Sequence, residues 1–231
     1  MLYLSLLTLP RTASRWRFLQ PYQLHQVLWK GFSDISGKIP DNRFLYRHDE
    51  REQEHSVLVQ SAVAPDWSFL ESETDGTCTQ VKKFDLGAFS EGTRFRFLLR
   101  ANPVVLRRGY PGEGRRGEEK RRLIPVGSDR QRMAKRLGLS IDRFPSREEQ
   151  LLDWLQKKGK GGGFELMDCV PGPNHDYVVR RVRKEPPLTL TGVEFEGILR
   201  ITDSNSFATT LQQGIGRGKG FGFGLLSMMR T

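Results

Sequence analysis

The segment PYQLHQVLWK at residues 21–30 constrains the fold most strongly, and we interpret it as the first helix of the protein. Proline suits the first position of a helix, and apolar residues recur every three to four positions, as on a buried helical face. Because successive residues turn by about 100°, Tyr22, His25 and Trp29 fall together at the edge of that face. A histidine held rigidly there, with an ordinary pKa of about 6.5, can transfer protons near neutral pH. The alternative is a structural histidine that packs beside two aromatic rings.

The segments on either side of this helix are typical of strands and of a second, short helix. In chain order, the first half is predicted to hold a strand at 2–9, the helix at 21–30, strands at 43–47 and 56–62, a helix at 64–70 and a strand at 93–101. This is the β-α-β-β-α-β order of a ferredoxin-like domain. Arg11, Arg15 and Arg17 precede the first helix and place positive charge close to His25.

The second half of the chain repeats a similar order. A capping box from Ser146 to Glu149 predicts a helix that ends near Gly159, and Asp203 predicts the start of a helix that reaches Gln213. Strands are predicted at 121–126, 164–170, 177–184, 193–201 and 221–228. We therefore expect an α+β protein of two tandem ferredoxin-like (RRM-like) domains. Their predicted ranges are 1–103 and 121–231, with a Gly/Arg-rich linker at 104–120.

Composition and charge narrow the class of partner. The chain of 231 residues carries 37 Lys and Arg against 27 Asp and Glu, and the net charge of +10 favours nucleic acid first and an anionic membrane surface second. Cys78 and Cys169 stand far apart without a C-x-x-C pair, so neither a disulfide framework nor a zinc site is expected. The sequence has no apolar run as long as a membrane span, and residues 1–10 do not resemble a signal peptide. We expect a cytoplasmic protein that makes no membrane contact.

The segment GIGRGKGFGFG at residues 214–224 has the most unusual composition in the chain. Backbone N–H groups in such a segment can approach a phosphate closely. The candidates for this contact are Gly216, Arg217, Gly218 and Lys219. The segment is not a Walker P-loop, because Gly220 stands where Ser or Thr would hold magnesium, and at Gly224 it departs from the RNP1 signature of RRM domains. A glycine-rich turn that lets a last strand pack closely is the structural alternative.

The other histidines carry weaker signals. His48 and His55 flank an acidic turn, but charged turns are usually just solvated, and we expect no metal site there. His175 follows a Pro-Asn pair and is expected in a hairpin loop. Because the sequence also contains no G-x-S-x-G nucleophile motif, His25 remains the main candidate for catalysis.

Four segments together resemble the CasE-type CRISPR repeat endoribonucleases of type I-E systems. They are PYQLHQVLW at 21–29, RANP at 100–103, FEG at 195–197 and GIGRGKGFGFGLLS at 214–227. The resemblance implies a metal-independent nuclease without a cofactor, which cleaves precursor CRISPR RNA at the 3′ base of each repeat hairpin and leaves a 2′,3′-cyclic phosphate. It also implies a protein that stays on the mature crRNA as a subunit of the Cascade complex, and that meets target DNA only through the crRNA.

The resemblance also implies roles for residues of the first helix. His25 matches the family histidine that transfers a proton while the ribose 2′-OH attacks, and Tyr22 matches a tyrosine that orients the phosphate or the histidine. Lys30 aligns near a basic residue of some members, but it points about 140° away from His25 on an ideal helix, so we expect a supporting role in RNA binding. Gln26 stands where some relatives carry arginine, so the cation near the phosphate must come from Arg15 and its basic neighbours or from the glycine-rich segment.

Recognition of the RNA stem is expected to depend on shape and phosphate contacts, because A-form RNA hides its base edges in a deep, narrow groove. The candidates on a predicted β-hairpin are Arg180, Arg181, Arg183 and Lys184. A catalytically silent subunit that only binds the RNA hairpin is the alternative to a nuclease.

Overall fold

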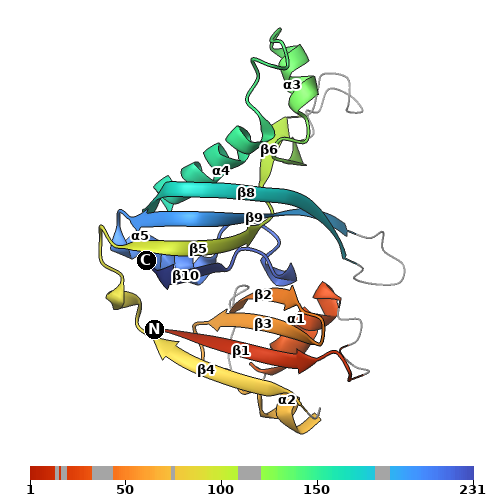
Figure 1. The fold of residues 1–231 in the computed structure, drawn as a ribbon, viewed down its shortest axis with the longest axis vertical. Coiled ribbons are helices and arrows are strands. Elements are labelled where there is room, and N and C mark those ends of the chain that lie inside the picture. The colour runs from red at the N-terminus through yellow and green to blue at the C-terminus, as the bar shows by residue number, and fades with distance from the viewer. Residues whose placement is uncertain (14–15, 17–19, 33–43, 74–75, 109–120, 180–187) are drawn as a thin grey trace.

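The computed structural model describes residues 1–13, 16, 20–32, 44–73, 76–108, 121–179 and 188–231. Their strands form two four-stranded antiparallel sheets and one separate two-stranded sheet (Figure 1). The first four-stranded sheet and its helices are built from β1 (Leu2–Pro10), α1 (Pro21–Lys30), β2 (Phe44–Glu50), β3 (Glu54–Ser61), α2 (Ser68–Glu73) and β4 (Cys78–Phe84). The strand order in this sheet is β2-β3-β1-β4.

The second four-stranded sheet repeats this arrangement with later elements. This sheet and its helices are built from β5 (Arg94–Ala101), α4 (Arg147–Gly161), β8 (Phe164–Val179), β9 (Leu188–Ile201), α5 (Ser204–Gln213) and β10 (Leu226–Arg230). The strand order is β10-β5-β9-β8, the same topology as in the first sheet. The prediction of an α+β fold with two ferredoxin-like domains is therefore confirmed.

Smaller elements connect or extend the two domains. A hairpin of β6 (Val104–Arg108) and β7 (Arg121–Pro125), followed by α3 (Arg130–Arg136), is inserted between β5 and α4. Two 3₁₀ turns complete the described chain, η1 (Leu86–Ala88) before β5 and η3 (Lys219–Phe221) before β10. In the part of the chain that the structure describes, no helix has both the length and the apolar composition to cross a membrane.

Local sequence signals explain where the helices begin. The Ser146 hydroxyl accepts a hydrogen bond from the Glu149 backbone N–H, and the Glu149 carboxylate accepts one from the Ser146 backbone N–H, which is the predicted capping box of α4. Asp203 caps α5 by accepting from the Ser206 backbone N–H at 2.6 Å. Both caps satisfy N–H groups that would otherwise have no partner in the helix.

Each domain has its own hydrophobic core. Leu24 and Leu28 of α1 are fully buried against apolar residues of β1, β2 and β3, and burial of such a side chain contributes about 1.5–3 kcal/mol. In the second domain, α4 and α5 pack on the apolar residues of β5 and β9, and Trp154 stacks on Phe195. The cores hold α1 rigidly in one domain and the segment around η3 in the other.

The structure corrects the partner of one predicted strand. Residues 93–101 do form a strand, but β5 pairs with β9 and β10 in the second sheet, although the predicted boundary at residue 103 places it in the first domain. The strand that completes the first sheet is β4, which pairs with β1 and which the sequence analysis missed. Most side chains of β4 are exposed, so it lacks the alternation of apolar residues that reveals a half-buried strand.

Three further predictions about the second half were wrong in detail. The strand predicted at 121–126 pairs with β6 outside both large sheets. The strand predicted at 164–170 and the start of the one predicted at 177–184 are a single strand, β8, so His175 lies within a strand and not in a hairpin loop. Pro171 and Pro173 did not end β8 because it is the edge strand, with a register shift between Pro171 and Asn174. The strand predicted at 221–228 begins only at Leu226, after the turn η3.

Candidate active site

His25 lies on α1 in a half-buried aromatic surrounding. Its ring centroid is 5.3 Å from that of Phe44, 5.9 Å from Trp29 and 6.4 Å from Tyr46. Burial lowers the pKa of His25 below 6.5, so the imidazole is neutral at neutral pH. Nδ1 is buried and has no hydrogen-bond partner, which leaves Nε2 as the nitrogen for proton transfer. A neutral imidazole in this setting can accept a proton from a substrate hydroxyl.

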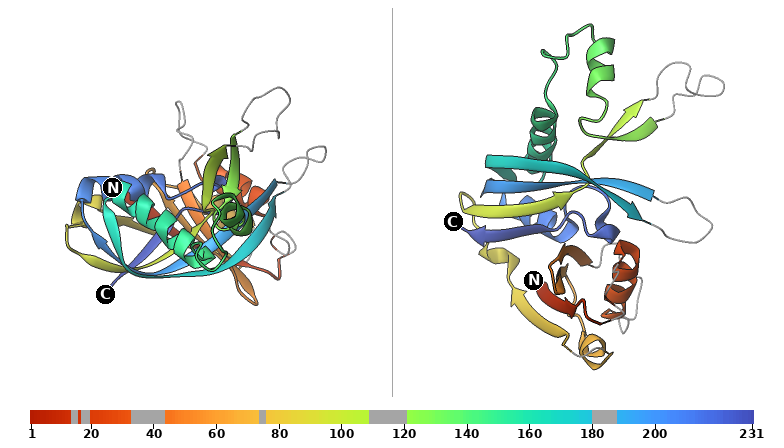
Figure 2. Two further views of the ribbon diagram at one scale, coloured as in Figure 1. Left: turned by 90° about the horizontal axis from the view of Figure 1, so that it is seen from above. Right: turned by 45° about the vertical axis from the view of Figure 1, so that its right-hand side comes forward.

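The glycine-rich segment of the second domain lies directly against this histidine. Figures 1 and 2 show η3 beside α1, although the two elements are almost two hundred residues apart in the chain. A methyl group on Gly220 would lie 3.7 Å from Cε1 and 3.8 Å from Nδ1 of His25. Gly218 and Gly222, which flank η3, have left-handed backbones with φ of 77° and 87°. The candidate active site therefore lies where the two domains meet.

Tyr46 connects the helix to the glycine-rich segment. This tyrosine on β2 is buried, and its hydroxyl lies 3.0 Å from the Pro21 carbonyl oxygen and 3.2 Å from the Gly220 carbonyl oxygen. Both oxygens can only accept, so the single hydroxyl proton is shared between them. A methyl group on Gly222 would lie 3.2 Å from Cε2 of the Tyr46 ring. Tyr46 thus contacts both halves of the candidate site.

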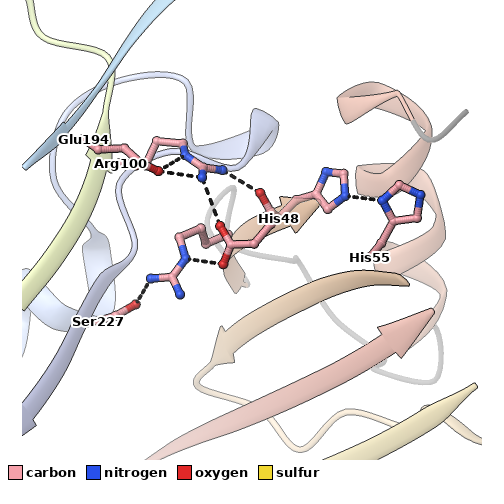
Figure 3. A network of polar contacts seen from close by, with 7 residues as sticks. His48, His55, Arg100, Glu194 and Ser227 are labelled. Carbon is pink, nitrogen blue, oxygen red and sulfur yellow. Dashed lines mark hydrogen bonds and ion pairs between the residues drawn. The ribbon is translucent and has the colours of Figure 1, made fainter. Parts of the chain in front are cut away.

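A network of ion pairs joins the same two domains at a second place (Figure 3). Arg100 of β5 donates to the His48 carbonyl oxygen at 2.6 Å, to the Asp49 carboxylate at 2.9 Å and to the Glu194 carboxylate at 2.6 and 2.9 Å. Arg47 of β2 donates to Asp49 at 2.8 Å and to the Ser227 hydroxyl of β10 at 2.7 Å. The network holds β2, which carries Tyr46, against the second sheet.

Comparisons with known proteins identify the family. The model of the CRISPR associated protein family matches residues 2–230. The chain belongs to this family of CRISPR-associated proteins, and within it to the Cse3/CasE proteins that the following two relatives represent. The CRISPR-associated endoribonuclease Cse3 of Thermus thermophilus is 30% identical over 228 residues, which cover 94% of this chain and 93% of that protein. The CRISPR system Cascade subunit CasE of Escherichia coli is 28% identical over 230 residues, which cover 98% of both chains.

The fold agrees with solved structures of the Cse3/CasE family. The structure of Thermus thermophilus Cse3 bound to an RNA representing a pre-cleavage complex superimposes with a TM-score of 0.71. This comparison has 27% identity and covers 99% of this chain and 98% of that chain. Similarity over nearly the full length means that both domains, and the junction between them, follow the family fold.

Two other residues of α1 that the family resemblance singled out have different surroundings. Tyr22 is half-buried and lies about one turn before His25 on α1, so it can reach the same substrate group. The exposed Lys30 has its ammonium nitrogen 6.0 Å from the centroid of the Phe69 ring, beside α2. Its charge therefore lies away from the rings around His25, in agreement with a supporting role.

Of the predicted phosphate-binding residues, Lys219 belongs to η3 beside α1, whereas Gly216 and Gly218 pack on aromatic rings of the second domain. Gly216 and Gly218 have φ of 85° and 77°, and a methyl group on Gly218 would lie 2.9 Å from the Phe223 ring. Arg217 pairs with Asn102 in an isolated bridge. Burial and the charge of Lys158 on α4 lower the pKa of Lys219. Both expected roles, close packing and backbone exposure to a phosphate, are compatible with this geometry.

Several predicted RNA contacts fall outside the described residues. They are Arg15 near the first helix and the basic group Arg180, Arg181, Arg183 and Lys184. Their assignment to RNA stays a prediction from charge and sequence position.

The structure reveals a histidine pair that the sequence analysis treated as a solvated turn. His48 Nε2 and His55 Nδ1 lie 2.8 Å apart, and His55 Nε2 lies 2.7 Å from the Trp16 carbonyl oxygen. Because that oxygen can only accept, His55 carries its proton on Nε2 and accepts from His48 on Nδ1. Burial is the main cause that lowers the pKa of His48 to about 4, so the His48 ring is neutral at neutral pH.

The same pair marks the place where a metal ion could be held. Among the described residues, His48, Glu50 and His55 have ligand atoms within 4.8 Å of one another. The facing nitrogens, His48 Nε2 and His55 Nδ1, already form a hydrogen bond, which a metal bound by both of them would displace. Register brings the two rings together, because β2 and β3 form a hairpin in which His48 lies opposite Val57 and Glu50 opposite His55, so the two histidines are diagonal neighbours.

Proposed function

We propose that this protein is a metal-independent endoribonuclease that cleaves precursor CRISPR RNA at the 3′ base of the repeat hairpin. The observation that carries the proposal is the position of His25: a neutral, half-buried imidazole that faces a glycine-rich turn from the other domain. Similarity to a protein named CRISPR-associated endoribonuclease Cse3, and to a structure of Cse3 with a pre-cleavage RNA, supports the same activity.

The proposed reaction needs few protein groups because RNA carries its own nucleophile. His25 accepts the proton of the ribose 2′-OH, the 2′-oxygen forms a bond to the adjacent phosphorus, and the bond to the 5′-oxygen breaks. The products are a 2′,3′-cyclic phosphate and a 5′-hydroxyl, whose proton comes from the imidazolium or from water. Tyr22 orients the phosphate or the histidine, and backbone N–H groups of the glycine-rich segment with Arg217 and Lys219 balance the charge that develops on the phosphate.

The proposal extends to the partners of the protein. A relative named CRISPR system Cascade subunit CasE supports retention of the cleaved crRNA within a Cascade complex, in which target DNA is met only through the crRNA. The net charge of +10 suits a protein that holds an RNA hairpin by its phosphates. A cytoplasmic location follows from this assignment and stays a prediction.

Replacement of one nucleotide tests the mechanism. A 2′-deoxy nucleotide directly upstream of the cleaved bond should stop cleavage, because the attacking hydroxyl is absent. Hairpin binding should weaken at most slightly, since the deletion removes one hydroxyl among many contacts, on the order of 1 kcal/mol.

The products decide between the proposal and its rivals. Continued cleavage of the 2′-deoxy RNA at that bond, or a 5′ fragment that ends in a plain 3′-hydroxyl, would mean that the enzyme activates water. A protein that binds the unmodified hairpin tightly but never cleaves it would instead be the catalytically silent RNA-binding subunit.

A further inference from the structure

Tyr46 is the described residue whose side chain joins the catalytic helix to the glycine-rich turn. Its hydroxyl lies within hydrogen-bond distance of Pro21 in the first domain and of Gly220 in the second. The residue is only 1% exposed, so water does not compete for the hydroxyl proton. The proposed catalytic role of His25 makes no use of this contact.

On the helix side, the contact fixes the turn that carries His25. Pro21 is the first residue of α1, and in an α-helix its carbonyl faces the backbone N–H of the residue four positions later, which is His25. A hydrogen bond from Tyr46 to this carbonyl therefore acts one turn below the imidazole. The Tyr46 ring also lies 6.4 Å from the His25 ring, centroid to centroid, so tyrosine and histidine share one packed cluster.

On the turn side, the contact fixes the backbone that lies against the imidazole. The Gly220 carbonyl accepts from Tyr46, while the α-carbon of the same residue faces Cε1 and Nδ1 of His25. Gly222, at the other end of η3, packs on the edge of the Tyr46 ring. Displacement of η3 would therefore change both the hydration of His25 and the place where a phosphate meets the backbone N–H groups.

We propose that Tyr46 is a positioning residue, which holds His25 and the turn Lys219–Phe221 at a fixed separation across the domain junction. The proposal rests on the proposed function of His25. Tyr46 has no proton-transfer role in this proposal, because its buried hydroxyl already donates to backbone carbonyl oxygens; burial also raises the pKa of this hydroxyl. Its effect on the rate is geometric: a displacement of about 1 Å between reacting groups can lower a rate about 100-fold.

The substitution Tyr46→Phe tests the proposal, because it keeps the ring and removes only the hydroxyl. Single-turnover cleavage at saturating protein should slow by about 10- to 100-fold, whereas the dissociation constant for the uncleaved hairpin should change less than about twofold. The matched control is Val57→Ala, which creates a cavity in the same core at a position of β3 that pairs with Leu7 and His48 and not with Tyr46. The control should cleave at the unmodified rate at temperatures well below its unfolding midpoint.

An NMR titration of His25 in the free protein separates positioning from stability. Uncharged groups pack on the His25 ring: Trp29 of its own helix, Phe44 and Tyr46 of β2, and Gly220 of the turn. The charged residue of η3 is Lys219, the neighbour of Gly220. Loss of the hydroxyl lets the turn move and hydrates the ring. The titration midpoint should therefore rise toward 6.5 in Tyr46→Phe and stay unchanged in Val57→Ala.

The outcomes separate this inference from the proposed function. If Tyr46→Phe cleaves at the unmodified rate with an unchanged His25 midpoint, while His25→Ala is inactive, the positioning role is wrong and the nuclease assignment stands. If His25→Ala cleaves normally, the proposed function fails, and the titration alone still decides whether Tyr46 positions the ring. A second measurement needs no variant: the Tyr46 hydroxyl proton should exchange slowly in the unmodified protein, and exchange as fast as that of an exposed tyrosine would overturn the proposal.

Discussion

At the level of single residues, the proposed chemistry depends on His25, whose pKa burial lowers. The rings of Phe44, Trp29 and Tyr46 surround one side of His25, and Gly220 lies against its Nδ1 edge. Such an environment disfavours the charged imidazolium before substrate binds. The phosphate of a bound RNA would reverse part of this effect, so the imidazole can take up a proton when the reaction requires it.

The substitution His25→Ala should lower the single-turnover cleavage rate by about 10²–10⁴, because it removes the proton acceptor, and should leave hairpin binding nearly unchanged. His175→Ala is the matched control, since His175 is an exposed histidine of β8 and should keep full activity. For the unmodified enzyme, kcat/KM should rise with pH through a midpoint below 6.5 and level off above it, because only the neutral imidazole accepts a proton. Cleavage by His25→Ala at a comparable rate would contradict the assignment.

Removal of metal ions should not change the cleavage rate. The proposed chemistry uses an imidazole and backbone N–H groups, and the candidate ligands His48, Glu50 and His55 already contain a hydrogen bond between the two imidazoles. The measurement is the single-turnover rate in EDTA with monovalent salt that keeps the hairpin folded. A rate that falls in EDTA and returns with magnesium or zinc would show that a metal ion takes part.

At the scale of elements, the short turn η3 has more influence on the site than its length indicates. It is held between two glycines with left-handed backbones, which allow it to turn tightly toward α1 and β2. The sequence analysis recognised this glycine-rich segment as a candidate for phosphate contacts. The strand predicted from residue 221 begins only at Leu226, because the residues before it form the turn η3 and the segment that follows it.

Gly222→Ala should lower both stability and activity. At φ of 87° an alanine is strained by about 1–2 kcal/mol, and its methyl group would lie 3.2 Å from Tyr46 and displace the turn from His25. Gly92→Ala is the matched control, since Gly92 has φ of 80° and no heavy atom within 4 Å of the added methyl group. Urea denaturation should show similar losses for both variants, while only Gly222→Ala should slow cleavage. Equal cleavage rates would mean that the position of η3 does not matter.

At the scale of the whole molecule, two domains of the same topology build a site that neither contains alone. The first domain supplies His25 and Tyr22, and the second supplies the glycine-rich turn. The relative position of the domains is therefore part of the candidate active site. Tyr46 and Arg47 of the first domain and Arg100 of the second are among the described residues whose side chains act at this junction.

Arg100→Met should destabilise the protein by about 1–2 kcal/mol, because it removes the guanidinium that pairs with both Asp49 and Glu194. The Arg100 side chain is only 16% exposed, so water screens these ion pairs weakly. Arg200→Met provides the control, since Arg200 pairs with Glu165 within the second sheet and is 43% exposed. Its loss should cost less than about 0.5 kcal/mol. Urea denaturation measures both values, and equal losses would argue against a special role of the junction.

Local features of the fold follow from side chains that lie a few positions apart in the sequence. The 3–4 residue spacing of Leu24 and Leu28 predicted α1 and its buried face, and Ser146 and Asp203 predicted where two later helices begin, because these signals depend on side chains a few positions apart. The motifs in their order also indicated the family, which the comparisons confirmed.

Only the tertiary structure decided which segments meet. The strand at 94–101 was predicted correctly, but the strands that pair with it were not. Strands pair through backbone N–H and C=O groups, which are the same for nearly every residue and therefore do not identify the partner strand. In the same way, nothing local to Gly220 or Tyr46 indicates that they lie beside His25. These contacts arise because two hydrophobic cores, each formed by distant parts of the chain, bring α1 and η3 together and bury the hydroxyl that joins them.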